Sequence, residues 1–242
     1  MIAVILCAGR GRRFNLKTPK CLIKIKNETL IEKCLKNLEK NKIKKKNTIL
    51  ATGYKENLIK ARVGHKYRFI KNKKYLTTNM VYTFFNTIKN FDNNQDIIIS
   101  YSDILYNTKD LKNLIKSKKD ITTLIDFNWK KTWKKKGKLL EDSETLKIKN
   151  QKIVSIGKKT RNIKDIDGRF IGITKFSSNI IKKLQSIYES HLKKNPGKFK
   201  KIDMTNFFNF LIKKNFAIFF TKSNKQWYEF DDKVDLDSFL FK

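Results

Sequence analysis

A glycine turn followed by a proline-anchored lysine lies near the start of the chain. Residues 7–14 read CAGRGRRF and residues 18–20 read TPK. Such a turn can bring backbone N–H groups against phosphate oxygens, and its arginines and Lys20 add positive charge. The segment lacks the third glycine of a dinucleotide-binding fingerprint and the Gly-Lys-Ser/Thr of a P-loop. Because Pro19 fixes the backbone just before Lys20, we predict a phosphate site of another kind and not an ordinary basic turn.

Carboxylates stand at the ends of two segments with strand character. Asp103 lies just after the predicted strand 96–100, and Asp231 follows the segment 226–230, in which Glu229 shares its face. Carboxylate oxygens are ligands that Mg²⁺ prefers. The chain has only 22 acidic residues against 56 basic ones, so acidic strand ends are informative. We predict that Asp103 can hold a metal ion, with a simple turn cap as the alternative, and that the acidic cluster at Asp231 belongs to the same site.

The pattern Gly-x-Gly-x-Arg at residues 9–13, followed by Pro-Lys-x-Leu at 19–22, resembles the signature of nucleotidyltransferases with a GT-A-like fold. These enzymes join a nucleoside monophosphate to a sugar phosphate, phosphocholine or a phosphonate. The resemblance implies that Lys20 touches the α-phosphate and that Arg13 acts with it by binding the outer phosphates. It also implies Mg²⁺ at Asp103 and Asp231. The nucleotide contacts that it implies are Ala8, Gly9, Arg10, Gly11, Arg12, Arg13, Gly53 and Asn79.

Two later segments, residues 72–83 and 168–175, resemble the choline-phosphate and phosphonate cytidylyltransferase branch of this family. Asn79 also stands where a helix N-cap is expected, which is the alternative role for its side chain. Arg169 replaces an acidic residue that many relatives have, which favours an acceptor with an extra anionic group. Trp129, near acidic residues, suits an ammonium group or covers the sheet edge. The acceptor contacts expected from the resemblance are Tyr82, Trp129, Glu144, Arg169 and Gly172.

These candidate residues need a scaffold, and apolar runs of strand length alternate with helical patterns along the chain. The alternation predicts an α/β fold, a Rossmann-like and mostly parallel mixed sheet flanked by helices. In such sheets ligands bind beyond the carboxyl ends of the strands. Strands are expected at residues 3–6, 48–52, 67–70, 96–100, 121–127, 170–175, 217–221 and 226–230. Helices are expected at residues 29–39, 55–62, 79–90, 108–117, 178–192 and 204–213.

Residues 128–168 interrupt this alternation. An irregular stretch, 129–142, precedes a short hairpin expected near residues 146–156. We interpret the segment as an insertion within one nucleotidyltransferase domain that spans residues 1–242, and we expect it to cover the acceptor side of the site.

Composition limits the classes of function. The formal charge is +34, but 49 of the 56 basic residues are lysine, spread along the chain. Proteins that recognise nucleic acid usually rely on arginine. We therefore expect a solvated basic surface and no nucleic-acid partner. No run approaches the roughly 18 apolar residues of a membrane span, and none resembles a signal peptide. Three cysteines without metal-ligand spacing favour the cytoplasm.

Together with the resemblance, these features predict a Mg²⁺-dependent cytidylyltransferase. It would join CMP from CTP to a small phosphonate or phosphocholine-like acceptor and release pyrophosphate. A sugar-1-phosphate nucleotidyltransferase is the alternative within the class, and the choice between CTP and UTP stays open. A GT-A glycosyltransferase is disfavoured because Asp103 lacks the usual Asp-x-Asp context, and a basic nucleic-acid-binding protein is a more remote alternative.

Overall fold

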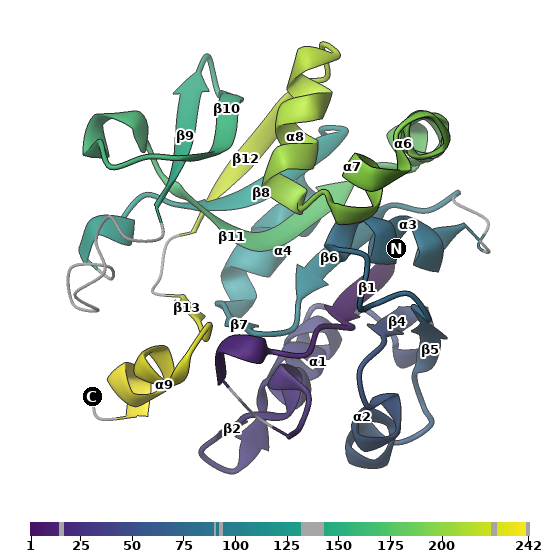
Figure 1. The fold of residues 1–242 in the computed structure, drawn as a ribbon. Helices are drawn as coiled ribbons and strands as arrows, with labels where there is room; N and C mark the ends of the chain where they lie inside the picture. The colour runs from purple at the N-terminus through teal and green to yellow at the C-terminus, as the bar shows by residue number, and fades with distance from the viewer. Residues whose placement is uncertain (15–16, 90, 92–93, 132–142, 224–226, 241–242) are drawn as a thin grey trace.

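The computed structural model describes residues 1–14, 17–89, 91, 94–131, 143–223 and 227–240, and its central feature is a nine-stranded sheet (Figure 1). In spatial order the strands are β5 (Arg68–Lys71), β4 (Thr48–Thr52), β1 (Ile2–Cys7), β6 (Ile97–Tyr101), β11 (Arg169–Phe176), β8 (Ile121–Asp126), β12 (Ile218–Ser223), β10 (Lys152–Lys159) and β9 (Glu144–Lys149).

The sheet is mixed, and most of its strands point the same way. β1 pairs in parallel with β4 and β6, β4 with β5, and β8 with β12. β11 runs antiparallel to both β6 and β8, and β10 runs antiparallel to both β12 and β9. Among the described strands of this sheet, therefore, only β11 and β10 oppose the rest. The expected α/β class with a mostly parallel mixed sheet is confirmed.

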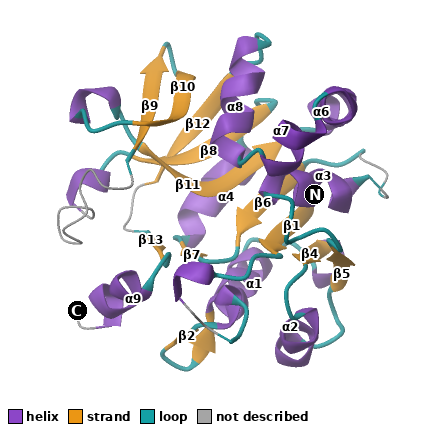
Figure 2. Cartoon of the chain, in the orientation of Figure 1, coloured by secondary structure: helices purple, strands orange, loops and turns teal. Residues whose placement is uncertain are grey.

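Helices cover both faces of the sheet (Figure 2). One face carries a core cluster that includes side chains of α3, α6, α7 and α8, and the other carries a cluster with α1, α2 and α4. None of the described helices is long and apolar enough to span a bilayer. The helices are α1 (Leu30–Lys40), α2 (Glu56–Val63), α3 (Met80–Ile88), α4 (Thr108–Lys116), α6 (Ser178–Lys194), α7 (Pro196–Lys201), α8 (Met204–Lys213) and α9 (Lys233–Leu240).

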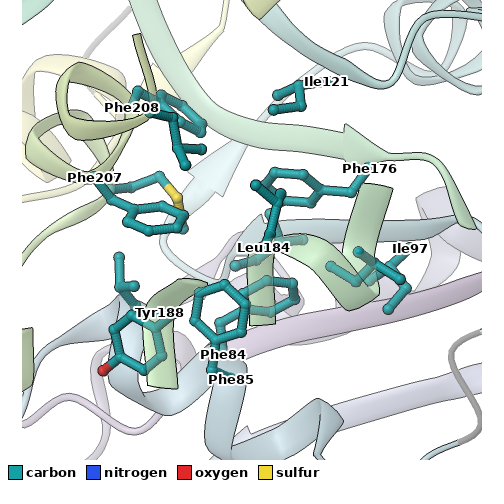
Figure 3. Packing of buried hydrophobic residues seen from close by; sticks show 14 of the residues in the cluster. Phe84, Phe85, Ile97, Ile121, Phe176, Leu184, Tyr188, Phe207 and Phe208 are labelled. Carbon is teal, nitrogen blue, oxygen red and sulfur yellow. The ribbon is translucent and has the colours of Figure 1, made fainter. Parts of the chain in front are cut away.

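Strand alternation divides the core between these two faces. In β1, Ile2 and Val4 pack into the first cluster while Ala3 and Ile5 pack into the second, as the two-residue period of a strand requires. The first cluster is rich in aromatic rings, which Figure 3 shows between α3, α6, α8 and β11. The Phe85 and Tyr188 rings stack there with centroids 4.4 Å apart.

The predicted elements agree with the structure along most of the chain, and the C-terminal part differs most. The expected strand 226–230 is only β13 (Tyr228–Glu229), which pairs with β7 (Ile104–Leu105) outside the central sheet. β13 is short because its partner strand β7 has only two residues. Residue 226 lies outside the described part of the chain. The helices expected from the sequence patterns did not include α7 or α9. The hairpin expected near 146–156 is longer, as β9 and β10, and it extends the sheet beyond β12.

Short elements complete the framework. A two-stranded ribbon forms from β2 (Lys24–Ile25) and β3 (Glu28–Thr29) just before α1. Single 3₁₀ turns occur at η1 (Arg12–Phe14), η2 (Lys20–Leu22), η3 (Lys45–Asn47) and η4 (Ile163–Asp165). The first two lie in and after the glycine turn, so they set the path of the chain around the candidate site.

An irregularity in β11 lies next to that site. Phe170 pairs with Ile125 and Thr174 with Thr123, so β11 uses more residues than β8 across this span. Gly172 lies within the irregularity at φ +82°, a conformation that side chains rarely adopt. A Cβ at this position would come within 2.6 Å of the Tyr101 ring. Bulges of this kind re-aim strands beside active sites, and here glycine leaves room for Tyr101.

We expect Gly172→Ala to lower the free energy of unfolding by about 1–3 kcal/mol, because the alanine must adopt a positive φ and displace the Tyr101 ring. Urea denaturation monitored by circular dichroism measures this change. Gly197→Ala is the control, because a Cβ there meets no atom within 4 Å and a helical alanine is neutral or stabilising by up to about 1 kcal/mol. Equal stability of the two variants would contradict the packing assigned to Gly172.

Candidate active site

A cavity of about 590 Å³ opens where β1 and β6 end. Its volume is in the usual range of small-molecule sites. The turn after β1, the residues after β6 and β13 line one part of it. The start of the β9–β10 hairpin, the start of β11 and the first turns of α3 and α8 line the rest. The cavity therefore lies beyond strand ends, where an α/β sheet gathers its loops.

The Lys20 ammonium joins two carboxylates at one end of this cavity. Its Nζ lies 2.6 Å from Asp103 Oδ2 and 2.8 Å from Asp231 Oδ1. Arg13 Nη2 lies 3.0 Å from the same Asp231 oxygen. The Lys20 side chain is 14% exposed and the two aspartates are 22% and 25% exposed. Residues that are 83 and 211 positions from Lys20 in the chain thus meet at a half-buried point, close enough to share one ligand.

The backbone fixes how Asp103 and Asp231 meet. β7 follows Asp103 and β13 precedes Asp231, and the pairing of these two strands brings the carboxylates to one place. The Phe230 N–H donates to the Asp103 carbonyl at 3.1 Å. The Asp231 N–H donates to the Asp235 carboxylate at 2.8 Å. Both aspartates are therefore held by main-chain hydrogen bonds, independent of the Lys20 ion pairs.

A buried hydrogen bond anchors the chain ahead of β13. The Trp227 indole N–H donates to Asp126 Oδ2 at 2.8 Å, and the Asn128 N–H donates to Asp126 Oδ1 at 2.8 Å. Trp227 is 1% exposed and Asp126 is 3% exposed. Because Asp126 ends β8, this bond ties the segment that carries Asp231 to the central sheet.

The glycine turn folds back onto Lys20. Gly11 has φ +62°, and a Cβ there would lie 2.9 Å from the Lys20 Cβ, so glycine is required for the close approach. The Ala8 carbonyl accepts the Tyr54 N–H at 3.1 Å, which holds the start of the turn against the end of β4. Gly9 has no atom within 4 Å of a Cβ position and lines the cavity. Its backbone is accessible to a ligand.

The acidic groups at this end are crowded. Burial, followed by the Asp231 and Asp103 charges, raises the pKa of Glu229 to about 8. Burial by itself would lower the pKa of Lys20, but the Asp103 and Asp231 carboxylates outweigh it and raise that pKa. The raised pKa disfavours the charged form of Glu229, as expected for a buried carboxyl next to the Asp103 and Asp231 charges.

Within the described residues, no three His, Cys, Asp or Glu side chains are grouped as a complete metal cage. Mg²⁺ does not require one, because it keeps several waters and is commonly bound by one or two carboxylates together with substrate phosphates. Asp103 and Asp231, which converge on one ammonium, offer the oxygen donors that such an ion needs. The residues present therefore fit Mg²⁺.

Most of the site residues expected from the sequence line this one cavity. Their individual roles in binding and catalysis stay predictions. Asn79 also caps α3, since its side chain accepts the Met80 N–H at 2.8 Å, so the cap role and a place in the cavity wall both apply to Asn79. The expected residues that line the cavity are Ala8, Gly9, Gly11, Arg13, Lys20, Asn79, Asp103, Glu144, Arg169, Gly172 and Asp231.

Four expected residues lie elsewhere. Trp129 is 1% exposed and packs in the core on the α1 and α4 side, so it covers the sheet and does not contact an acceptor in this cavity. Tyr82 packs against the opposite core. Gly53 lies behind the turn against Tyr75 and the Ala8 carbonyl, and Arg10 is exposed over the Tyr54 ring.

The Arg12 side chain lies outside the described part of the chain, and only its backbone in η1 is described. No placement is therefore assigned to its expected nucleotide contact.

Sequence reasoning also missed several residues of the cavity. Tyr101 at the end of β6 and Asp203 at the N-cap of α8 line it, and so does Glu229, which the sequence indicated only as a neighbour of Asp231. A signal existed for Tyr101 and Glu229, because each stands beside a predicted metal ligand at a strand end. Asp203 carried only the signal of a helix cap, and its contribution follows from the packing of α8 near the hairpin.

The sheet and its convergent site define an α/β nucleotidyltransferase. The chain belongs to the MobA-like NTP transferase domain family, whose model matches residues 3–126. It is also 34% identical over 251 aligned positions to the CTP:phosphoglutamine cytidylyltransferase of Campylobacter jejuni subsp. jejuni, with 98% of each chain covered. The expected membership in this class of enzyme is confirmed.

Solved structures share the fold across nearly the whole chain. The inositol-1-phosphate CTP transferase from T. maritima superposes with a TM-score of 0.76 at 19% identity, covering 99% of this chain and 92% of its own. The CTP:phosphocholine cytidylyltransferase from Streptococcus pneumoniae gives 0.73 at 19% identity, covering 99% and 97%. At these identities the likeness establishes the fold alone.

Because Asp103 and Asp231 share the Lys20 ammonium, removing that charge tests whether the two carboxylates can hold another cation. We expect Lys20→Met to lower the Tm by about 3–8 °C in EDTA, because Asp103 and Asp231 then repel each other in a half-buried place. Added Mg²⁺ should restore the Tm of this variant more than it raises that of the wild type, measured by scanning fluorimetry without nucleotide.

The control for this experiment is the double variant Lys20→Met with Asp231→Asn, which removes one of the paired carboxylates. Its Tm should respond little to Mg²⁺. If Lys20→Met and the double variant respond to Mg²⁺ equally, Asp103 and Asp231 do not form a common cation site.

Proposed function

We propose that this protein is a cytidylyltransferase that transfers CMP from CTP to a small acceptor bearing a phosphate or phosphonate group, with release of pyrophosphate. The observation that carries the proposal is the convergence of Lys20, Asp103 and Asp231 at one end of the 590 Å³ cavity. The relative named CTP:phosphoglutamine cytidylyltransferase is matched over 98% of its length, which supports CTP as the donor.

The reaction is a displacement at phosphorus. An oxygen of the acceptor phosphate forms a bond to the α-phosphorus of CTP, and the bond from that phosphorus to the β-phosphate oxygen breaks. Because the attacking oxygen is already an anion near neutral pH, no histidine or serine base is needed. The protein has to position two polyanions in line and to neutralise their charge.

Each residue of the cluster has a part in this scheme. Lys20 stabilises the charge on the α-phosphate, and Arg13, 60% exposed at the cavity rim, binds the departing pyrophosphate. Backbone N–H groups of the turn around Gly9 and Gly11 assist Arg13, in the way that phosphate-binding turns do. Asp103 and Asp231 would hold Mg²⁺, which supplies charge neutralisation for the phosphates.

The proposal also includes a cellular compartment and a second class of acceptor. We propose the cytoplasm, because all three cysteines are buried free thiols, which is typical of a reducing compartment. A sugar 1-phosphate is the runner-up acceptor class, and it is retained in the test below. No feature of the described surface beyond its lysine content favours nucleic acid as a partner.

A pyrophosphate-release assay tests the proposal. Four nucleoside triphosphates are crossed with phosphoglutamine, phosphocholine, 2-aminoethylphosphonate and a sugar 1-phosphate, with Mg²⁺ present. We expect release with CTP and one acceptor class, formation of the CMP conjugate by mass spectrometry, and loss of activity in EDTA. Release with UTP and sugar 1-phosphates alone would replace the proposal by its runner-up.

Two variants test the assigned roles. Lys20→Ala and Asp103→Ala should each lower kcat by at least about 10²–10³-fold, because each removes charge stabilisation at the reacting phosphate. Their circular dichroism spectra should remain those of a folded protein. Lys112→Ala, an exposed lysine of α4, is the control and should keep wild-type kcat. Near-wild-type turnover in Lys20→Ala or Asp103→Ala would refute the roles.

A further inference from the structure

The part of the cavity away from Lys20 is charged in both signs. Glu144 at the start of β9 and Arg169 at the start of β11 both line it. Asp203 at the N-cap of α8 lines it as well. The reaction proposed above takes place at the Lys20 end of the cavity. It assigns no role to the charged residues of this other part.

The fold holds the Glu144 and Arg169 segments together. Leu146 bridges to Ile166 in the chain just before β11. The Asp167 N–H donates to the Leu146 carbonyl at 2.8 Å, and the Asp167 carboxylate accepts the Ile148 N–H at 2.8 Å. Hairpin and strand are thus fixed to each other within a few residues of both charged side chains, so the two charges keep a set spacing along the cavity wall.

Arg169 is half-buried and lies among carboxylates of the site. It pairs across the sheet with Asp126, and its charge lowers the pKa of both Asp126 and Glu229 against the larger effect of burial. Arg169 therefore stands between the phosphate end and the hairpin. A guanidinium there suits a planar anion, and it binds a carboxylate through two parallel hydrogen bonds.

Asp203 and Glu144 differ in how accessible their carboxylates are to a ligand. Asp203 accepts the Asn206 N–H at 2.8 Å and the Asn206 side-chain amide at 2.9 Å, so both of its oxygens serve the cap of α8. Glu144 is exposed and lines the cavity, so a ligand can reach its carboxylate. Of these two residues, Glu144 is better placed to receive a cationic group of a ligand.

The described tryptophans do not offer a quaternary ammonium a binding face in this cavity. Recognition of that group uses a cage of ring faces, with tryptophan the most effective. Trp129 and Trp227 are both 1% exposed in the core and do not line the cavity, and Trp133 lies outside the described residues. Tyr75, Tyr101 and Phe170 do line it, and the Tyr101 and Phe170 rings lie edge to face against each other with centroids 5.9 Å apart. An acceptor such as phosphocholine has no carboxylate to offer Arg169. A cavity with one guanidinium and one exposed carboxylate matches a primary ammonium and a carboxylate instead.

We infer that the acceptor is zwitterionic, a phosphorylated amino acid, and that Arg169 binds its carboxylate while Glu144 binds its ammonium group. This inference rests on the proposed cytidylyltransferase function and assigns two specificity-determining residues to it. It agrees with the acceptor in the name of the Campylobacter jejuni relative.

The test compares three acceptors that differ by one charge each. They are phosphoglutamine, its decarboxylated analogue (phosphorylated 4-aminobutanamide) and its deaminated analogue (phosphorylated glutaramate). In the wild type, loss of either charged group should lower kcat/KM about 10- to 100-fold, the usual value of a charge-assisted hydrogen bond. The loss should appear mainly in KM, since neither group reacts.

The variants Arg169→Gln and Glu144→Gln complete a double cycle. Arg169→Gln should lower kcat/KM for phosphoglutamine about 10- to 100-fold and abolish discrimination against the decarboxylated analogue only. Glu144→Gln should abolish discrimination against the deaminated analogue only. Arg161→Gln and Glu189→Gln, exposed and outside the cavity lining, are matched controls that should keep the wild-type ratios.

The outcomes separate the inference from the proposed function. If CTP is turned over but Arg169→Gln lowers kcat/KM for all three acceptors equally, Arg169 serves their common phosphate and the inference is wrong. The inference is also wrong if phosphocholine is the preferred acceptor. If no acceptor yields a CMP conjugate with CTP, the proposed function itself fails.

Discussion

One ammonium group between two carboxylates is the constraint on which the rest of the structure depends. Lys20 follows the turn after β1, Asp103 follows β6, and Asp231 arrives from near the C-terminus, yet Lys20 Nζ is within 2.8 Å of both carboxylates. A charge can be half-buried in this way only if its partners are fixed in place. The carboxyl ends of β1 and β6 must therefore be neighbours, and the parallel pairing of these strands makes them so.

The C-terminal partner is the harder one to position, because β13 does not belong to the central sheet. Buried polar contacts position it from two points along the chain. The Ser223 hydroxyl donates to Asp110 at 2.8 Å where β12 ends, and the Trp227 N–H donates to Asp126 before β13 begins. Buried carboxylates that accept hydrogen bonds tolerate few other arrangements. These bonds thus direct the chain that delivers Asp231.

What the sequence predicted well depends on local periodicity. The runs of β1 and β6 are apolar at nearly every position because both faces are covered, and that pattern is readable. The direction of β11 could not be predicted from the sequence, because an apolar strand has the same composition whether it runs parallel or antiparallel. Trp129 was expected at the acceptor for its residue type, but burial decides whether an aromatic ring meets a ligand or a core. The signature around Lys20 was informative because Gly11 has a positive φ that requires glycine and Pro19 has a φ of −54° that suits proline.

The topology also explains how one cavity can carry two kinds of recognition. The parallel strands β1 and β6 supply the turn, Lys20 and Asp103, to which the proposed function assigns the triphosphate. The antiparallel strand β11 and the hairpin supply Arg169 and Glu144 from the other side. Because these side chains stand on separate elements, a change in the hairpin or in β11 would, under the proposed roles, alter the acceptor without disturbing the phosphate end. Loops and edges on a fixed scaffold are where such variation is tolerated, so the inferred roles of Arg169 and Glu144 place acceptor choice on the elements that can vary without disturbing β1 and β6.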